Sequence, residues 1–497
     1  MATPIGTNSI TAISRRFILP EIADNVYLDN VLFWRLNAAN KKLIQGGTQI
    51  EIPLMYAAFV SGGAYQGFDV LDVSPSDTVQ SAAFDWRQYF QTIGAGSAGA
   101  FIVSQPSYFA AMAQMTDAVP LATWKVWLKW KVIHAYANLL DKAMVDADFA
   151  FYGATLRGIP ENRPRWKRGV GAVEGSLGEA VGKLYVERHF PPEAKARMDG
   201  IVKNVIAAYR QSIQNLDWMG PETKRKAIAK LAAFNPKIGY PKKWRDYSSL
   251  EIRRGDLVGN LERATTFEWR RDLAKLGKPV DRDEWIMTPQ TVNAYYNPSQ
   301  NEIVFPAAIL QPPFFNLTAD DAVNYGGIGA VIGHETGHGF DDQGSKWDGA
   351  GNLNQWWTPA DRAEFDKRGD ALVAQFDQFE PFPGFKVNGR FTLGENIGDL
   401  SGLTIAYDAY RLSLGGKQAP VIDGLTGDQR FFLGWAQVWR RKHREADLKN
   451  RLVVDPHAPA EYRVNGTVRN VPAFYAAFGV KEGDKLYLPP EKRVRIW

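Results

Sequence analysis

The spacing of apolar and polar residues changes along the chain and divides it into parts of different character. Residues 1–94 hold short apolar runs broken by glycine, serine and aromatic residues. Around Ile50 and Ile52, apolar and polar positions alternate after a Gly-Gly turn signal, which predicts a strand. The glycine- and alanine-rich run at 94–100 is typical of a linker. The pattern therefore predicts a segment of strands and loops, joined to the rest of the chain by this linker.

Beyond the linker, apolar residues recur at helical spacing. Residues 124–144 form one such segment, with Thr123 as the expected N-cap. A second helix is predicted for 193–216, where two prolines precede it, and a third for 222–234 after a Gly-Pro break. Their lysine and arginine residues fall on the outer faces, which is more typical of a solvated surface than of a binding site. This part of the chain is predicted to be mainly helical.

The pattern changes again near Trp285, where strands are expected. Residues 291–296 have strand propensity, an Asn-Pro turn follows, and 302–305 complete a hairpin. The apolar stretch 306–315 is interrupted by prolines and is too broken for a helix. It either lines a pocket or belongs to the packed core.

Composition and charge limit the classes of protein. A chain of 497 residues has room for two to four domains, and 45% apolar residues are normal for a soluble globular protein. No window approaches the roughly 18 unbroken apolar residues that a membrane span needs. Residues 1–16 lack the apolar stretch of a signal peptide. The sequence as it stands therefore predicts a soluble protein, cytoplasmic in the absence of a signal, and leaves its cellular location open. Nothing in the pattern indicates an oligomeric state.

Two further features of the composition exclude types of site. Because the chain has no cysteine, disulfides, a thiol nucleophile and cysteine-ligated zinc are all excluded. The net charge of +5 comes from basic residues scattered among acidic ones, so no nucleic-acid partner is expected.

The candidate chemistry centres on the motif His-Glu-x-x-His. In a helix, His334 and His338 lie one turn apart on one face, so both imidazoles can reach a single metal ion. Glu335 stands beside them, where a zinc hydrolase needs a base. The alternative is a chance match on an ordinary helix, which six histidines in the whole chain make rare. Gly333 and Gly337 each weaken this helix by about 1 kcal/mol relative to Ala, so a closely packed neighbour is expected.

A catalytic zinc site has three protein ligands and a fourth position for water or substrate, so two histidines leave one protein ligand to be found. Glu395 and Asp399 are four residues apart and share a face if they are helical. Glu395 can then bind the metal, while Asp399 can accept the second N–H of a ligand histidine and so fix its tautomer. The alternative is an ordinary acidic helix N-terminus, where the helix dipole favours carboxylates. His134 and His189 have no acidic companions at ligand spacing, and a structural or surface role is expected for both.

Taken together, the two stretches resemble the neprilysin family of zinc metallopeptidases, the M13 family of gluzincins. The resemblance covers about residues 100–497. The matching segments follow the family pattern in order: 293–296, 303–306, 309–315, 324–329, 331–344, 356–358, 394–399, 402–403 and 495–497. What it implies is a mainly α (α+β) fold, a two-lobed zincin with a thermolysin-like catalytic lobe and a helical lid.

The resemblance also implies the role of individual residues. It implies one zinc ion per chain, held by His334, His338 and Glu395, with Glu335 as general base and Asp399 as the supporting carboxylate. His457 and Arg463 match the pair that stabilises the tetrahedral intermediate and holds the substrate. The other implied substrate-binding residues are Asn293 and Ala294, in a strand along the substrate backbone, and Ile309, Phe314, Val331, Val438 and Trp439, around the residue after the scissile bond. His443 matches no functional position and is interpreted as a surface histidine.

The N-terminal segment has a different resemblance. Over about residues 15–93, features such as 30–34 and 82–86 resemble the N-terminal part of HK97-like phage major capsid proteins. The alternative is an unrelated α+β extension. Three domains are therefore predicted: a capsid-like or unassigned segment at 1–94, a helical lid region at 95–280, and a zinc-binding catalytic domain at 281–497.

The function predicted from these residues is a zinc-dependent metalloendopeptidase that hydrolyses oligopeptides. The family normally carries a longer N-terminal portion, and an unrelated segment is expected in its place here. Two alternatives remain open at this point. The first alternative to the peptidase is a truncated or fused zinc-binding protein without turnover. The second is a capsid-type assembly module that carries the peptidase as a passenger.

Overall fold

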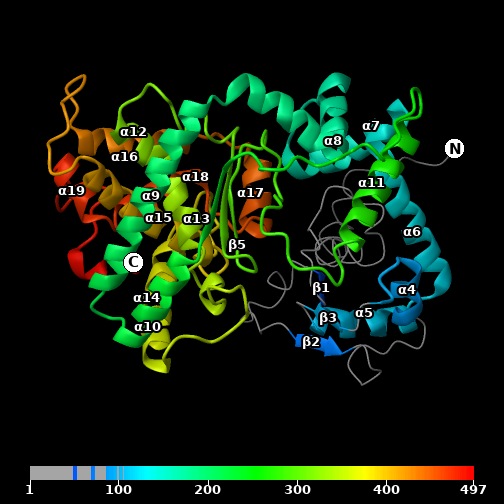
Figure 1. The fold of residues 1–497 in the computed structure, drawn as a ribbon, viewed down its shortest axis with the longest axis horizontal. Helices are drawn as coiled ribbons and strands as arrows, with labels where there is room; N and C mark the ends of the chain where they lie inside the picture. The colour runs from blue at the N-terminus through cyan, green and yellow to red at the C-terminus, as the bar shows by residue number, and fades with distance from the viewer. Residues whose placement is uncertain (1–48, 53–68, 73–84, 98–99, 104–105) are drawn as a thin grey trace. The chain divides into compact units, whose positions relative to one another are not determined.

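The structure is a computed structural model that describes residues 49–52, 69–72, 85–97, 100–103 and 106–497 (Figure 1). The chain forms two compact units: residues 1–178 with 245–286, and residues 179–244 with 287–497. The boundary falls within the helix α8 (Arg165–His189). None of the described helices is long and apolar enough to cross a membrane.

A small three-stranded sheet belongs to the first unit. The strands β1 (Gln49–Ile52) and β2 (Asp69–Asp72) both pair with β3 (Ala100–Val103), β1 in parallel and β2 antiparallel. The strand expected around Ile50 and Ile52 is therefore confirmed. The Gly-Gly turn before it lies outside the described residues.

The helices of the first unit include α4 (Trp86–Thr92), α5 (Pro106–Ala118) and α11 (Leu257–Leu273). Phe90 of α4 packs in a small apolar cluster with Leu273 of α11. The indole of Trp269 donates a hydrogen bond to the carbonyl oxygen of Ile93, 2.8 Å away. Residues 85–97 are thus packed against a helix that follows them by more than 150 residues.

The helix predicted for 124–144 is wrong at both ends. The helix α6 (Leu121–Tyr136) begins after Pro120 rather than at Thr123, and a 3₁₀ turn at Ala137–Leu139 follows it. A new helix, α7 (Lys142–Asp148), then begins because the Asp141 carboxylate accepts a hydrogen bond from the N–H of Met144. An aspartate at this position favours a helix start over a helix interior, and apolar periodicity does not register it. A π-helical turn at Phe149–Thr155 continues from α7.

The second unit confirms the other two predicted helices. They are α9 (Pro192–Asn215) and α10 (Pro221–Ala232), each with a proline in its first turn. The strand β4 (Asn235–Gly239) runs parallel to β6 (Glu302–Pro306), which pairs antiparallel with β5 (Tyr295–Asn297). The hairpin is confirmed, although β5 begins only at Tyr295. The stretch after β6 forms turns and no helix, as expected.

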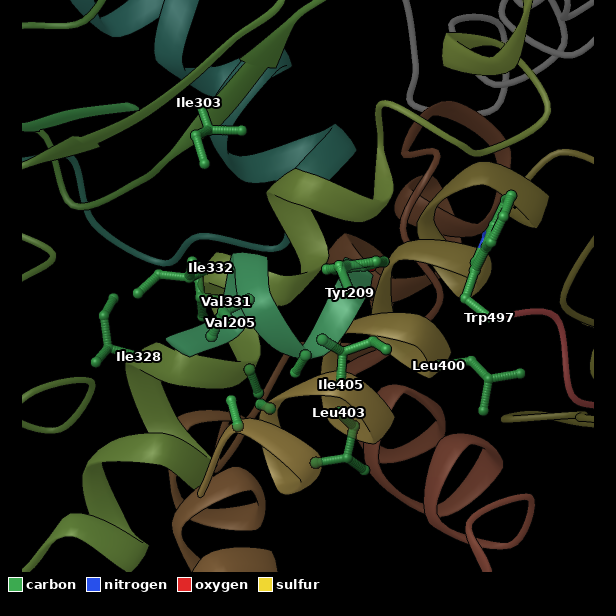
Figure 2. Close-up of a cluster of buried hydrophobic side chains, with 14 of the residues drawn as sticks. Val205, Tyr209, Ile303, Ile328, Val331, Ile332, Leu400, Leu403, Ile405 and Trp497 are labelled. Atoms are coloured by element: carbon green, nitrogen blue, oxygen red, sulfur yellow. The ribbon is translucent and has the colours of Figure 1, made fainter. Parts of the chain in front are cut away.

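The core of this unit is built where α13 (Ala330–Gly337), α15 (Leu393–Ser413) and α9 pack together (Figure 1). Every residue of α13 is buried. Figure 2 shows Val205 and Tyr209 of α9, Ile332 of α13 and Leu403 of α15 in this apolar cluster. The helix α12 (Asp321–Asn324) and a π-helical turn at Tyr325–Gly329 lead directly into α13.

The expected close neighbour of α13 is α15. A Cβ added to Gly333 would lie 2.6 Å from the carbonyl oxygen of Gly402, and one added to Gly337 would lie 2.5 Å from Ser401 Oγ. At Gly333 the two helix backbones approach too closely for a side chain, and at Gly337 the side chains of Ser401 and Tyr209 fill the space.

Five more helices complete the second unit, and the chain ends inside its core. They are α14 (Pro359–Phe376), α16 (Gly427–Val438), α17 (Glu445–Val454), α18 (Ala460–Val468) and α19 (Pro472–Phe478). Trp497 is 1% exposed, and its ring packs against those of Trp218, Phe340 and Phe365.

Candidate active site

The helix α13 and its C-cap residue, His338, present two imidazoles on one face, as their spacing predicts. The ring centroids of His334 and His338 are 4.5 Å apart. Because α15 crosses α13 so closely, the first turn of α15 brings Glu395 against both rings. Its carboxylate oxygens lie 3.2 Å from His334 Nε2 and 3.8 Å from His338 Nε2. One potential ligand atom from each of the three residues lies within 4.8 Å of the others.

A second carboxylate orients each histidine. His334 Nδ1 lies 2.9 Å from Asp399 Oδ1, and His338 Nδ1 lies 2.7 Å from Asp341 Oδ2. An imidazole that donates its Nδ1–H to a carboxylate keeps the lone pair of Nε2 for a metal. Both Nε2 atoms face Glu395. The sequence predicted this role for Asp399 but not for Asp341. The feature that could have indicated Asp341 is its position three residues after the second histidine.

The residues present fit a zinc ion. Glu395 Oε2 is buried and, among the described residues, has no partner with hydrogen-bond geometry, although His334 Nε2 is 3.2 Å away. Atoms that converge without hydrogen bonding are arranged like ligands around a cation. Burial disfavours protonation of His338, yet the charges of Glu395 and Asp341 raise its pKa to about 10, so the site attracts positive charge. Two imidazole nitrogens and one carboxylate oxygen form a donor set that zinc accepts. His334, His338 and Glu395 make up the zinc site.

Glu335 is buried beside the zinc site and lines the same cavity. Burial raises the pKa of its carboxyl group, although the two histidines oppose this effect. A carboxylate with a raised pKa is better suited to take up a proton.

His457 and Arg463 come from the C-terminal part of the chain. His457 Nε2 lies 3.1 Å from Glu395 Oε2, and its Nδ1 lies 2.7 Å from Asp455 Oδ1. Burial disfavours the charged ring, but Glu395 and Asp455 raise the pKa of His457 to about 9. These two carboxylates favour the protonated imidazole, which can act as a hydrogen-bond donor.

Arg463, on α18, is buried and donates two hydrogen bonds of 2.6 Å to the Asp399 carboxylate. Its guanidinium carbon lies 3.9 Å from the centroid of the Trp439 ring. Asp399 thus receives hydrogen bonds from His334 and from Arg463. The carboxylate that orients a zinc ligand also holds this arginine in place.

A cavity of about 560 Å³ joins these residues. All the site residues predicted from the sequence line it except Val438, which is buried at the end of α16. The lining ones are His334, Glu335, His338, Glu395, Asp399, His457, Arg463, Asn293, Ala294, Ile309, Phe314, Val331 and Trp439. Asn293 and Ala294 directly precede β5 rather than lying within it.

Three basic residues of the cavity wall were not predicted. Arg441, His443 and Arg451 line it, from the loop after α16 and from α17. His443, which was expected at the surface, is part-buried and lines the cavity, and its Nδ1 lies 3.3 Å from Asp447 Oδ2. The available signal was the basic run at 440–444, directly after Trp439.

His134 and His189, for which a structural or surface role is expected, do not line this cavity. His134 Nδ1 lies 2.7 Å from Asp148 Oδ1, and its ring stacks on Tyr152. The ring of His189 lies beside that of Tyr185. Both positions agree with the structural or surface role that was expected.

Comparison with known proteins gives consistent matches. The model of peptidase family M13 matches residues 293–494, and a second model of this family, for its N-terminal part, matches residues 70–241. The neutral endopeptidase of Lactobacillus helveticus is 37% identical over 417 residues, which are 84% of this chain and 62% of the relative. Human neprilysin is 35% identical over 410 residues, which are 80% of this chain and 54% of the relative. The chain thus spans little more than half the length of such relatives.

Solved structures agree with these matches. The crystal structure of the zinc metalloprotease Zmp1 of Mycobacterium tuberculosis, in complex with an inhibitor, superposes with a TM-score of 0.81 at 57% identity. The match covers 84% of this chain and 64% of that one. The crystal structure of PepO from Lactobacillus rhamnosis gives a TM-score of 0.74 at 35% identity, over 83% of this chain and 66% of that one.

The second family match corrects the prediction for the N-terminus. Because that match begins at residue 70, the expectation of a capsid-like or otherwise unrelated segment up to residue 94 is wrong. The capsid resemblance rested on short apolar and aromatic patterns that recur in unrelated folds, and most of them lie outside the described residues. The packing of residues 85–97 against α11 agrees with the correction. The fold is the mainly helical one of these peptidases.

Proposed function

This chain belongs to peptidase family M13, and we propose that it hydrolyses the peptide bonds of oligopeptides as a zinc-dependent metalloendopeptidase. One observation carries the proposal. A buried glutamate, Glu335, stands beside three converging zinc ligands in a cavity that also holds His457 and Arg463. Zinc without a base, or a base without zinc, would not support hydrolysis of an amide.

The chemistry assigns each residue a distinct task. Bound zinc would polarise the scissile carbonyl and make water a stronger nucleophile at neutral pH. Glu335 takes the proton of the attacking water and later delivers it to the leaving amine. Asp399 and Asp341 keep His334 and His338 in the tautomer that leaves Nε2 free.

His457 and Arg463 donate hydrogen bonds to the oxygen that becomes negative as water adds to the carbonyl. Their positions are already held by Asp455 and Asp399, so little reorganisation is needed when that charge develops. Loss of one such donor typically lowers the rate by about 10²–10³.

The remaining lining residues provide the contacts for a peptide. Asn293 and Ala294 offer polar groups to the substrate backbone at the edge beside β5. Ile309, Phe314, Val331 and Trp439 form an apolar pocket for the side chain that follows the scissile bond, and Val438 packs behind it. A sequence preference for an apolar residue at that position follows.

The domain division remains part of this proposal. The predicted division is a thermolysin-like catalytic lobe at about 281–497 and a helical lid at about 95–280. We place residues 179–244 with the lobe, because α9 packs against α13 and α15 and β4 pairs with β6. Support comes from the cavity, whose lining residues all fall between 292 and 463.

A peptidase assay of the full chain tests the function. An internally quenched peptide with an apolar residue after the scissile bond should be cleaved, and a zinc chelator should stop the cleavage until zinc is restored. The variant Glu335→Gln should hold one zinc per chain yet lose activity. A wild-type chain that holds zinc but cleaves no peptide in such a series would refute the proposal.

A further inference from the structure

We propose that Arg441 is a specificity-determining residue that binds a carboxylate of the peptide on the C-terminal side of the scissile bond. The inference rests on the proposed peptidase function and adds a substrate preference to it. The carboxylate has two possible sources, an acidic side chain and the free C-terminus of a short peptide. Both present the same planar anion to the guanidinium group.

Arg441 lies where such a group would meet the substrate. It follows the end of α16 by three residues and lines the same cavity as the zinc site. Its guanidinium carbon lies 5.7 Å from the centroid of the Trp439 ring, and the guanidinium carbon of Arg463 lies 3.9 Å from the same centroid. Trp439 lines the apolar pocket proposed for the residue after the scissile bond. Groups beside this indole therefore face the C-terminal part of a bound peptide.

The acidic side chains of the cavity already pair with other residues or have a role in the proposed reaction. Asp399 is held by Arg463, and Asp455 lies 2.7 Å from His457 Nδ1 and also pairs with Arg451. Glu395 is a zinc ligand and Glu335 is the proposed base. Among the described residues, none forms an ion pair with the Arg441 side chain.

The surroundings of Arg441 are electrostatically positive. Burial and then the nearby charges of Arg463 and Arg451 lower its pKa, with Asp455 acting in the opposite direction. A guanidinium group still keeps its proton in proteins. A site that holds several cations close together gains free energy from an anion that enters it. A carboxylate suits the fork of an arginine because two parallel N–H groups can donate to its two oxygens.

Arg440 provides a matched comparison in the same chain. Both residues are exposed and adjacent in the sequence, but only Arg441 lines the cavity. An unspecific effect of positive charge near the cleft would involve both arginines. A carboxylate-binding role predicts an effect for Arg441 alone.

Two peptide pairs separate the two sources. In the first pair, the residue after the apolar one is Glu or Gln, and the C-terminus is amidated in both. In the second pair, a peptide that ends shortly after the scissile bond carries a free carboxylate or an amide. For at least one pair, we expect wild-type kcat/KM to be roughly tenfold higher for the charged member, as for one charge-assisted hydrogen bond. The pair that shows the preference identifies the source.

Variants then assign the preference to Arg441. The charged-to-neutral ratio should fall towards one in Arg441→Ala, be partly retained in Arg441→Lys, and stay at the wild-type value in Arg440→Ala. Arg441→Glu should instead favour a peptide with Lys over one with Gln. Zinc content and thermal midpoint, measured for each variant, show whether it is folded, and the reversed preference in Arg441→Glu cannot come from misfolding.

The outcomes distinguish this inference from the function on which it rests. A wild-type enzyme that cleaves charged and neutral peptides equally well would overturn the role of Arg441 and leave the peptidase proposal standing. An unchanged ratio in Arg441→Ala would do the same. A chain that cleaves none of the peptides would refute both.

Discussion

Gly333 of α13 and Gly402 of α15 meet so closely that a Cβ on Gly333 would lie 2.6 Å from the Gly402 carbonyl oxygen. The same crossing places Glu395 against the histidines that flank this contact. The distance between two helix backbones therefore determines whether the third zinc ligand can reach the other two. Packing and chemistry are coupled at this one point.

The variant Gly333→Ala should separate α13 from α15. A methyl group that must displace backbone on both helices should lower the free energy of unfolding by about 1–3 kcal/mol. It should also weaken zinc binding, because Glu395 moves away from His334 and His338. Thermal denaturation and competition with a chelator measure the two effects.

Gly200→Ala is the control for the glycine experiment. Gly200 lies in α9, is exposed, and a Cβ there would meet no atom within 4 Å. This variant should be as stable as the wild type or more stable by about 0.4–1 kcal/mol, since the unfolded chain loses freedom. Similar losses in both variants would contradict the role assigned to the crossing.

The variant Glu395→Ala should lose zinc, since two imidazoles alone hold the ion weakly. Metal analysis after dialysis should find one zinc per chain in the wild type and in Glu335→Gln, but little in Glu395→Ala. The comparison is matched because both variants remove one buried or part-buried carboxylate of the same cavity. Stoichiometric zinc in Glu395→Ala would show that Glu395 is not a ligand.

The variant Asp399→Asn should impair two functions with one change. The carboxylate accepts from His334 and from Arg463, and an amide nitrogen in its place would face a donor. We expect zinc affinity to fall by about 10–100-fold, as is typical for a supporting ligand, with a lower kcat because Arg463 is no longer held. Activity measured at saturating zinc separates the two effects. Wild-type affinity and wild-type kcat together would contradict the bridging role.

These residues show which parts of the site helical periodicity could predict. His334, His338, Glu395 and Asp399 lie on two helices whose four-residue spacing determines their faces, and the structure brings them together. The glycines of α13 indicated a closely packed neighbour, because glycine weakens a helix and is kept where another backbone approaches. The face on which a helical residue lies follows from its spacing in the sequence and does not depend on the path of the loops.

The contacts that were missed depend on irregular backbone. Asp341 reaches His338 through the turn after α13, and Arg441 enters the cavity through the loop that follows α16. A loop path depends on tertiary packing, which has no period in the sequence. The separate start of α7 has a local cause, the capping carboxylate of Asp141. At the N-terminus, short apolar and aromatic patterns do not identify a fold, and the family match from residue 70 corrects the capsid-like prediction.

Asp361 gives the fold a dependence on pH. Its carboxylate, 7% exposed near the start of α14, accepts hydrogen bonds from the Gly220 N–H at 2.8 Å, the Thr358 hydroxyl at 2.7 Å and the Thr223 hydroxyl. Burial raises the pKa of Asp361, but these hydrogen bonds outweigh burial and hold the pKa below its ordinary value. Because the folded-state pKa is the lower one, the stabilisation is fully present above the unfolded-state pKa of about 4. It is lost as the pH falls through the folded-state value.

Asp361→Asn should therefore lower the free energy of unfolding at pH 7 by about 1–3 kcal/mol, because an amide N–H group would face buried donors. The difference from the wild type should begin to shrink below about pH 4, where the carboxylate becomes protonated in the unfolded state while it is still ionised in the folded state. Chemical denaturation at pH 7 and at pH 3.5, with a chelator present throughout, measures this difference without a contribution from zinc release. Asp366→Asn, at an exposed position of the same helix, should change stability by less than about 0.5 kcal/mol at either pH. A difference between wild type and Asp361→Asn that stays constant or grows in acid would show that the charge of this carboxylate does not stabilise the fold.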